Sequence, residues 1–451
     1  MRTIVPVRVM VPVRKFFSRS SSGAMFLFAS TLIALVISNS PLAEHFEALW
    51  RTKMGFTIGN FSIYKPLRLW INDGLMSVFF FVVGLELKRE VVAGELANPQ
   101  NAVVPFVAGL GGMLLPAAIF VWFNYQTSGE AINGWGIPMA TDIAFALGVM
   151  YLLGNKVPLV LRIFLTALAI IDDIGAVLVI AFFYTSEISM GNLAIGAGFL
   201  TTMAIGNVLG VRSTLFYGIL GIAGLWLAFL LSGVHATIAA VLAAFTIPSN
   251  FEINKERYIR RTRYLMKKYI ELPKRKTKAR MLAEEQYQVL EKMRKSTDRA
   301  VPPLQKLEHN LHDVTAYLVL PLFALANAGV EFSGSFAENF GSSISLGIIA
   351  GLIVGKVVGI TGFLFVFEKL RIIRLPASLN YPLIIGTAFL AAIGFTMSLF
   401  ITSLAYDDYA NIDRAKVGIL TASLVAGTLG YFILKKAINK LPELDENLDN
   451  H

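Results

Sequence analysis

Cysteine is absent from the 451-residue chain. This absence excludes a disulfide framework, a thiol nucleophile and any metal site built on cysteine. Charge is also scarce, because Asp, Glu, Lys and Arg together make up only 16% of the residues. Apolar residues reach 55%, and the mean hydropathy is +0.63. This composition lies far outside the range of soluble globular proteins and indicates an all-α polytopic membrane protein.

The net charge of +10 comes largely from one part of the chain. Residues 249–308 contain 17 Lys and Arg against 8 Asp and Glu, a net charge of +9. A basic protein can bind nucleic acid, but a basic loop between apolar segments is typical of the cytoplasmic side of a membrane protein. We therefore expect membrane lipids, and no nucleic acid, as the partner of this loop.

Apolar segments predict about twelve transmembrane helices. They cover residues 24–37, 69–87, 103–124, 137–153, 159–184, 190–209, 213–229, 231–248, 311–330, 344–367, 379–404 and 412–434. Lys and Arg are absent from the loops 125–136 and 330–343, whereas they occur in the N-terminal segment, at 88–89, 156 and 212, and in 249–308, 369–374 and 435–440. By the positive-inside rule, this alternation places both termini in the cytoplasm.

The chain divides accordingly into five segments. They are a cytoplasmic N-terminal segment (1–23), spans 1–8 (24–248), a long basic cytoplasmic loop (249–308), spans 9–12 (309–436) and a cytoplasmic tail (437–451). In the basic loop, Leu282, Val289, Leu290 and Met293 follow helical spacing. They predict one or two amphipathic helices on the inner leaflet, with a disordered basic linker as the alternative.

The first outer loop carries the pattern of a β-hairpin at about residues 54–66. Apolar and polar residues alternate around Gly59-Asn60, which is a two-residue turn signal. Because an isolated hairpin is marginal in water, pairing with a second copy would stabilise it and would make a homodimer. A plain surface hairpin fits the pattern equally well.

Two adjacent aspartates, Asp172 and Asp173, lie in the middle of the apolar run from Leu159 to Phe183. An acidic side chain at the centre of a spanning helix costs on the order of 2.5–3.5 kcal/mol. A packing role could be filled by Ser or Asn at lower cost. The pair therefore indicates a site that faces a cavity, an ion or a partner.

Two other spans are interrupted by small and polar residues. Thr141 and Asp142 follow Gly136-Ile-Pro138, and Gly394 and Thr396 interrupt the eleventh predicted span. A break in a spanning helix exposes carbonyl groups and helix ends, which can bind ions where they line a cavity. Interrupted spans in separate halves of the chain indicate a transporter built from inverted-topology repeats.

One lysine, Lys356, is predicted at mid-span between glycines. A buried ammonium keeps its charge when it pairs with a carboxylate. With Asp142, Asp172 and Asp173, it gives the interior a net charge of −2, so the site should hold protons, a small cation, or each in turn. Carboxylates, the Thr141 hydroxyl and freed carbonyls suit an alkali cation such as Na⁺ at Asp172 and Asp173. No transition-metal site and no cofactor are expected.

Seven motifs in this order closely resemble the NhaA-type bacterial sodium/proton antiporters over almost the whole chain. They are LWIND at 69–73, VGLELKRE at 83–90, ATDIAFALG at 140–148, AIIDD at 169–173, SGVHAT at 232–237, LEH at 307–309 with His312, and IGFTMS at 393–398. The family is a known example of inverted repeats. Its resemblance implies a secondary antiporter of the bacterial inner membrane, not an enzyme, that exchanges cytoplasmic Na⁺ or Li⁺ for H⁺.

The resemblance also assigns the ion site. It implies that Asp172 and Asp173 bind the cation and the protons, and that Lys356 pairs with Asp172 until sodium binds. Thr141 and Asp142 would belong to the crossing of two broken helices, the fourth and eleventh spans.

A regulatory cluster is implied as well. The cytoplasmic residues that match the family's pH-sensing positions are Glu86, Arg89, Glu90, Glu308, His309 and His312, and His235 matches a position linked to the pH response. The Gly59-Asn60 hairpin matches the periplasmic hairpin through which family members dimerise. The loop from Ser249 to Lys306 departs from the family, because it is several tens of residues longer than the usual link and leads directly into Glu308.

Three other functions remain open at this point. An intramembrane aspartyl protease would use Asp142 and Asp172, but the Gly-x-Gly-Asp context of those enzymes is missing. A channel could use the same acidic cavity for downhill flux. A broader monovalent cation/proton exchanger, or a proton-coupled solute carrier of related fold, is the third alternative.

Overall fold

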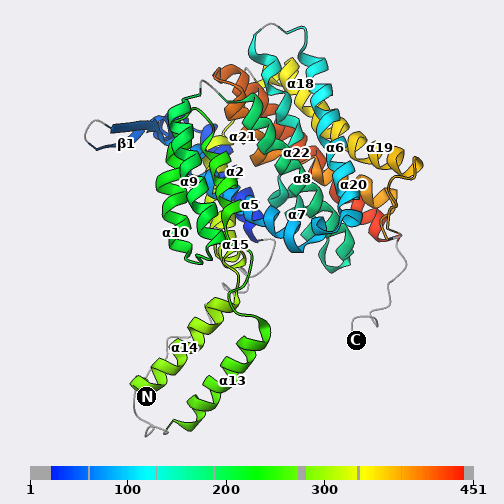
Figure 1. Ribbon diagram of the computed structural model, residues 1–451. Coiled ribbons are helices and arrows are strands. Elements are labelled where there is room, and N and C mark those ends of the chain that lie inside the picture. The colour runs from blue at the N-terminus through cyan, green and yellow to red at the C-terminus, as the bar shows by residue number, and fades with distance from the viewer. Residues whose placement is uncertain are drawn as a thin grey trace, which may run out of the picture.

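The computed structural model describes residues 22–440 except 59–60, 128, 186–187, 273–280, 333–335 and 377. In this part of the chain almost every element is a helix, and the strands form one two-stranded sheet. The helices lie side by side in a bundle, and one pair of helices extends from it (Figure 1).

The helices have the following bounds in the first half of the chain: α2 (Ser22–Ser38), α3 (Ala43–Arg51), α4 (Leu67–Trp70), α5 (Met76–Ala93), α6 (Pro99–Asn124), α7 (Ile143–Tyr151), α8 (Leu159–Phe183), α9 (Met190–Val208), α10 (Thr214–Ile219), α11 (Leu227–Leu230) and α12 (Ala236–Thr246). Those of the second half are α13 (Lys255–Glu271), α14 (Glu284–Ala300), α15 (Pro303–Val314), α16 (Leu320–Asn327), α17 (Phe336–Gly341), α18 (Ser343–Ala350), α19 (Lys356–Lys369), α20 (Tyr381–Ala391), α21 (Phe395–Ala405) and α22 (Tyr409–Ile438).

Short π-helical segments continue four of these helices without a break in the chain. They are η1 (Ile71–Leu75), η5 (Leu220–Trp226), η6 (Thr315–Val319) and η7 (Gly351–Gly355), which join α4 to α5, α10 to α11, α15 to α16 and α18 to α19. Three 3₁₀ segments lie in connections: η2 (Glu95–Ala97), η3 (Glu130–Met139) and η4 (Gly154–Lys156). Such local changes in helix winding are frequent at functional sites.

Four helices of the described residues are long and apolar enough to cross a membrane. They are α6, α8, α22 and the continuous helix Ser343–Lys369. The count rises to six if each of two bent pairs, α2 with α3 and α20 with α21, is one span. The twelve predicted spans therefore stay a prediction, because several of the apolar segments fold as shorter helical pieces, such as α10, η5 and α11 in the segment 213–229.

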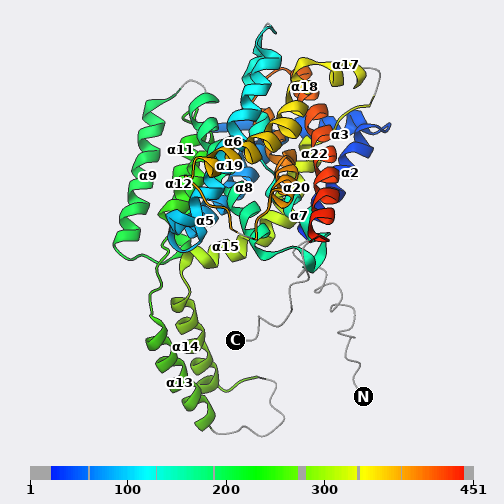
Figure 2. The same ribbon diagram turned by 90° about the vertical axis from the view of Figure 1, so that its right-hand side faces the viewer.

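The bundle contains two groups of helices. In one, α5 packs against α12 and α15, and α2 packs against α16. In the other, α6 packs against α8, α18 and α19, and α22 packs against α18 and α20. Figure 1 and the view turned by 90° (Figure 2) place α9 and α19 in different parts of the bundle.

The closest approach between α6 and α19 is made by two glycines. A Cβ atom added to Gly359 would lie 2.1 Å from the Gly111 carbonyl oxygen, and one added to Gly111 would lie 2.2 Å from the Gly359 carbonyl oxygen. Small residues allow this contact between helix backbones in membrane proteins, where dispersion replaces the hydrophobic effect as the force between helices.

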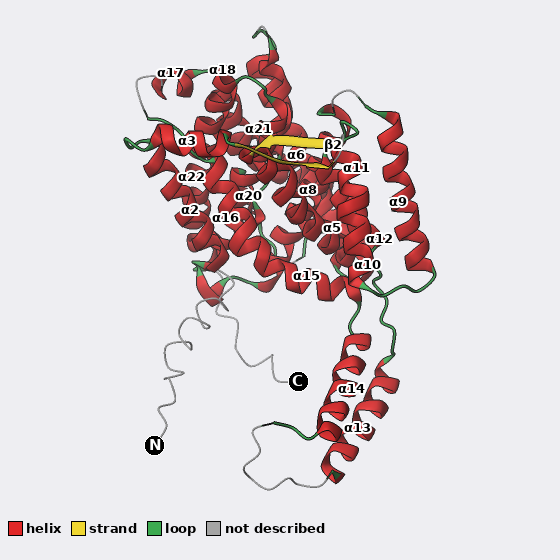
Figure 3. Cartoon of the chain, turned by 90° about the vertical axis from the view of Figure 1, so that its left-hand side faces the viewer, coloured by secondary structure: helices red, strands yellow, loops and turns green. Residues whose placement is uncertain are grey.

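The two strands of the β-hairpin predicted in the first outer loop are present in the structure. Strands β1 (Lys53–Ile58) and β2 (Phe61–Pro66) pair antiparallel, with Lys53 opposite Pro66 and Ile58 opposite Phe61. The predicted turn, Gly59-Asn60, lies outside the described residues. The sheet lies at the edge of the bundle in Figure 1, and Figure 3 shows it across the near face, with α11 and α9 to one side.

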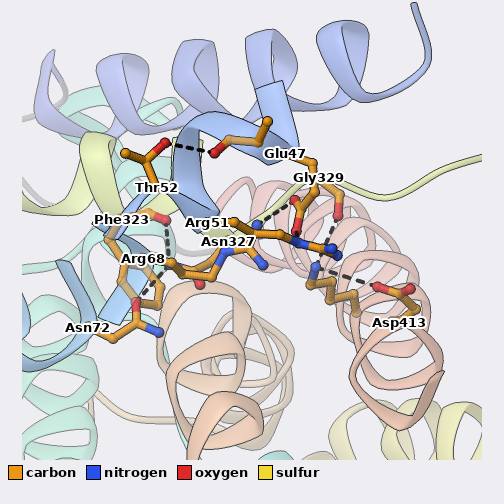
Figure 4. A network of polar contacts seen from close by, with 11 residues as sticks. Glu47, Arg51, Thr52, Arg68, Asn72, Phe323, Asn327, Gly329 and Asp413 are labelled. Carbon is orange, nitrogen blue, oxygen red and sulfur yellow. Dashed lines mark hydrogen bonds and ion pairs between the residues drawn. The ribbon is translucent and has the colours of Figure 1, made fainter. Parts of the chain in front are cut away.

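Polar contacts near the β-hairpin connect distant parts of the sequence (Figure 4). The Glu47 carboxylate on α3 accepts from Arg68 at 2.6 Å and from Arg51 at 3.0 Å. On α22, Lys416 donates to the Gly329 carbonyl at 3.2 Å. These contacts fix the ends of α3, α4 and α22 at the side of the bundle opposite α13 and α14.

Helices α13 and α14 are the pair that extends from the bundle (Figures 1, 2 and 3). They confirm that the basic loop contains amphipathic helices, and they replace the alternative of a disordered linker in the described residues. In the structure they point away from the other helices, so their predicted position on the inner leaflet stays a prediction.

The glycine contact gives a test of the packing between α6 and α19. Gly359→Ala should destabilise the protein by about 1–3 kcal/mol, since the new methyl group overlaps a carbonyl oxygen. The measurement is the thermal unfolding midpoint in detergent. Gly362→Ala on the same helix is the matched control, because a Cβ there meets nothing within 4 Å. Equal midpoints for the two variants would contradict the close approach.

Candidate functional site

The site is built where two chain interruptions meet. The backbone is extended at Ala140 and Asp142, between η3 and α7, and the chain bends by 46° between α20 and α21. The Asp142 N–H donates to the Ile393 carbonyl at 2.7 Å. The N–H group left unpaired at one interruption therefore bonds to the carbonyl group left unpaired at the other. Buried backbone groups need such partners.

Asp142 caps the first turns of two helices. Its Oδ1 accepts from the Phe145 N–H of α7 at 3.0 Å. Its Oδ2 accepts from the Thr396 N–H of α21 at 3.0 Å and from the Thr396 hydroxyl. One carboxylate thus supplies acceptors and negative charge to two helix N-termini, which carry unsatisfied donors and partial positive charge. Gly394 immediately precedes α21.

A buried ion pair lies next to this crossing. Lys356 Nζ is 2.5 Å from Asp172 Oδ2, and both side chains are completely buried. The Thr141 hydroxyl accepts from Lys356, and its oxygen lies 2.6 Å from Asp172 Oδ2 and 2.7 Å from the Ala391 carbonyl oxygen. Through these contacts, Thr141, Asp172 and Lys356 connect α8 and α19 with both interruptions.

Asp173 completes the group of buried acids. It follows Asp172 on α8 and is 2% exposed. Oδ1 of Asp173 and Oδ1 of Asp172 are buried and have no hydrogen-bond partner among the described residues. A buried carboxylate oxygen without a partner is costly, so both atoms are suited to bind a proton or a cation. In the same part of the chain, no group of three or more His, Asp or Glu is arranged for a metal ion.

A second polar cluster lies at the end of α5 and the start of α15. Arg89 forms ion pairs with Glu308 and, at 2.7 Å, with Glu90. A cavity of about 270 Å³ opens here; its lining residues are Arg89, Gln305, Glu308, His309 and His312. Burial raises the pKa of the Glu308 carboxyl, and the positive charge of Arg89 opposes this shift.

Glu86 and His312 extend this cluster along α5 and α15, and the His312 side chain is largely exposed. His312 Nδ1 lies 3.9 Å from Glu86 Oε1. The six residues predicted as a cytoplasmic cluster are thus brought together around one cavity and its edge. The interaction is charged only when the histidine is protonated, so it depends on pH.

His235 lies apart from that cluster. Its Nε2 is 2.6 Å from the Tyr184 carbonyl oxygen at the end of α8, whereas Lys88 donates to the carbonyls of Phe245 and Ile247 at the end of α12. Since α12 begins directly after His235, the length of the helix separates it from Arg89 by roughly 15 Å. This role of Lys88 was not predicted from the sequence, because its acceptors lie more than 150 residues away in the chain.

The comparison with known proteins agrees with the seven motifs. The family described as Na+/H+ antiporter 1 matches residues 14–434. The chain is 44% identical over 428 residues to the Na(+)/H(+) antiporter NhaA of Oleidesulfovibrio alaskensis, which covers 95% of this chain and 94% of the relative. It is 45% identical to the NhaA of Wolinella succinogenes, covering 93% and 92%, and 40% identical to that of Shewanella frigidimarina, covering 97% and 99%. The chain belongs to the NhaA Na+/H+ antiporter family.

Membership in the NhaA family settles the class of the protein. NhaA proteins are transporters and not enzymes, so the aspartyl protease alternative is excluded. With its long apolar helices, the chain is a multi-pass protein of the inner membrane.

The buried ion pair predicts an effect on stability. Lys356→Ala should lower the free energy of unfolding by about 3–5 kcal/mol, since it leaves the Asp172 charge buried without its partner. The unfolding midpoint in detergent measures this. Lys356→Ala combined with Asp172→Asn removes both charges and should recover part of the loss. A single variant that unfolds like the wild type would show that the two groups are not a charged pair.

Proposed function

We propose that the chain is a secondary active antiporter that moves Na⁺ or Li⁺ out of the cytoplasm in exchange for H⁺. The single observation that carries this proposal is the pair of adjacent buried carboxylates on α8, each with one oxygen that has no partner among the described residues. Oxygen ligands suit an alkali cation. The same oxygens bind protons, so proton and cation compete for one site.

In this proposal, Lys356 competes with the cation for the Asp172 carboxylate. In the absence of a cation, its ammonium pairs with Asp172 and compensates one negative charge. When Na⁺ binds to Asp172 and Asp173, the attraction between Lys356 and Asp172 weakens, and protons leave the site. Thr141 contacts both partners of the pair, and it can bind either one during the exchange.

The movement that we propose is alternating access. The interruptions at 140–142 and 392–394 are the crossing of two broken spans, within a fold of twelve spans and inverted repeats. The site opens first to the cytoplasm and then to the outside. If two protons exchange for one Na⁺, each net charge moved contributes about 2.3 kcal/mol per 100 mV, so an inside-negative potential drives sodium out.

Regulation by pH is assigned to the cluster around Arg89 and Glu308. The raised pKa of Glu308 brings its protonation closer to neutral pH than for an ordinary glutamate. When it loses its proton it pairs fully with Arg89, and this links α15 to α5. His235 takes no part in this cluster.

The assembly proposed is a homodimer that pairs through the β1–β2 hairpin, with both termini in the cytoplasm and lipids around the apolar helices. An antiparallel sheet of two strands presents free edges that a second copy can extend. A broader monovalent cation/proton exchanger, or a proton-coupled solute carrier of related fold, is the second candidate, since the same buried carboxylates would serve either one.

A transport assay tests the ion site. In inverted membrane vesicles with an acidic interior and a pH-sensitive dye, Na⁺ and Li⁺ should release protons, and K⁺ or choline should not. Asp173→Asn should abolish the response, because it removes a charge that the cation needs. Asp413→Asn on α22 is the matched control at an exposed carboxylate and should keep wild-type exchange. Exchange retained by Asp173→Asn would overturn the site, and flux without counter-protons would favour a channel.

A second assay tests the pH cluster. Glu308→Gln cannot ionise, so the exchange rate of this variant should depend less steeply on pH than that of the wild type. The measurement is the same dye response between acidic and alkaline pH. Glu338→Gln changes an exposed glutamate on α17 and should leave the profile unchanged. An unaltered profile in Glu308→Gln would remove this residue from the regulation.

A further inference from the structure

The extended helical pair, α13 with α14, is a small antiparallel coiled coil. The inward residues follow heptad spacing on both helices: Tyr258, Thr262, Leu265 and Tyr269 on α13, and Gln286, Val289, Met293 and Ser296 on α14. Leu265 and Val289 are 5% and 3% exposed. The Tyr258 and Thr297 hydroxyl oxygens are 3.2 Å apart, which fixes the register between the helices.

A second apolar stripe on this pair is exposed. Ile259, Met266 and Ile270 recur on α13 at spacings of seven and four, about a quarter turn from the inward face. The register places Leu290 of α14 at the level of Met266, and helix handedness directs it to the same side of the pair. These four side chains are 36–73% exposed. We name them the apolar stripe.

Positive charge lies beside the apolar stripe and on the opposite face of α13. On α13, seven basic residues outnumber two acidic ones; the basic residues are Lys255, Arg257, Arg260, Arg261, Arg263, Lys267 and Lys268. Each of them is exposed. A helix with an apolar face bordered by Lys and Arg is typical of a segment that lies in the headgroup region of an anionic membrane. We propose that α13 and α14 dock on the anionic inner leaflet through the apolar stripe.

An acidic soluble protein would match the charge of α13 equally well. The covalent connection of the pair to the bundle in the membrane favours the membrane as the partner. Seventeen helical residues reach about 25 Å, so the stripe always stays within that distance of its own membrane. A tethered contact has a high effective concentration, whereas a soluble partner loses translational and rotational freedom on binding. Each cation near an anionic surface strengthens the contact roughly five-fold.

Docking requires the pair to rotate towards the bilayer about the two segments that join it to the bundle. The pair joins the bundle through residues 248–254 and 301–302. Asp298 of α14 pairs with Lys306 of α15 at 2.7 Å, but both side chains are more than 40% exposed, so this ion pair is weak. The rotation would pull on α15, the helix that carries Glu308.

This inference rests on the proposed cytoplasmic position of residues 249–308, but its test is independent of transport and of topology. Because the chain has no cysteine, Met266→Cys provides a single labelling site without other changes. The full-length protein, labelled with a polarity-sensitive fluorophore, is placed in nanodiscs of phosphatidylcholine alone or with phosphatidylglycerol. Nanodiscs expose both membrane faces to the same solution.

The expected result is a blue shift of the Met266→Cys label in discs with phosphatidylglycerol, with reversal at high salt. Tyr264→Cys is the matched control: it lies two residues away, on the other side of α13, and its label should keep an aqueous spectrum. Replacing Arg260, Arg261, Arg263 and Lys267 by Gln should abolish the shift. Identical spectra in both kinds of disc would overturn the proposal. A label that responds to added polyglutamate but not to phosphatidylglycerol would overturn it in favour of an acidic protein partner.

Discussion

The ion pair between Lys356 and Asp172 is the contact on which the interior depends. Both side chains are completely buried, and neither could keep its charge there alone. The pair joins α19 to α8, and through Thr141 it reaches the interruption before α7. A charge that is stabilised in this way can also be exchanged, because any cation that replaces the ammonium satisfies the same carboxylate.

The backbone groups at the two interruptions have to find hydrogen-bond partners within the protein. A helix that ends inside a bilayer leaves donors and acceptors without water, and these must be satisfied by protein. Here the peptide groups of Asp142 and Ile393 satisfy each other, and the Asp142 carboxylate caps both following helices. Among the buried carboxylates of the described residues, Asp172 and Asp173 are those that keep an oxygen without a hydrogen-bond partner.

Sequence reasoning identified these residues because ionisable side chains in apolar runs are rare and costly. The strands of the β-hairpin and the helices of the basic loop followed from alternation and from helical spacing. The position of His235 was not predictable, since motif order says nothing about which end of α12 meets Arg89. The arrangement of α13 and α14 as an extended pair was not predicted, because an apolar stripe predicts a buried face but does not say which surface covers it. Lys88 was missed because a lysine that caps a distant helix has no local pattern.

The glycines of α6 and α19 have a mechanical consequence. Added Cβ atoms at Gly111 and Gly359 would each overlap the other helix, and one at Gly109 would lie 2.5 Å from the Ile171 side chain on α8. Close contact of this kind leaves little room for the helices to slide past one another. We therefore expect α6, α8 and α19, and with them Lys356 and Asp172, to move together as one body. Whatever motion exposes the buried carboxylates must occur at the borders of that body, where larger side chains pack and can change rotamer.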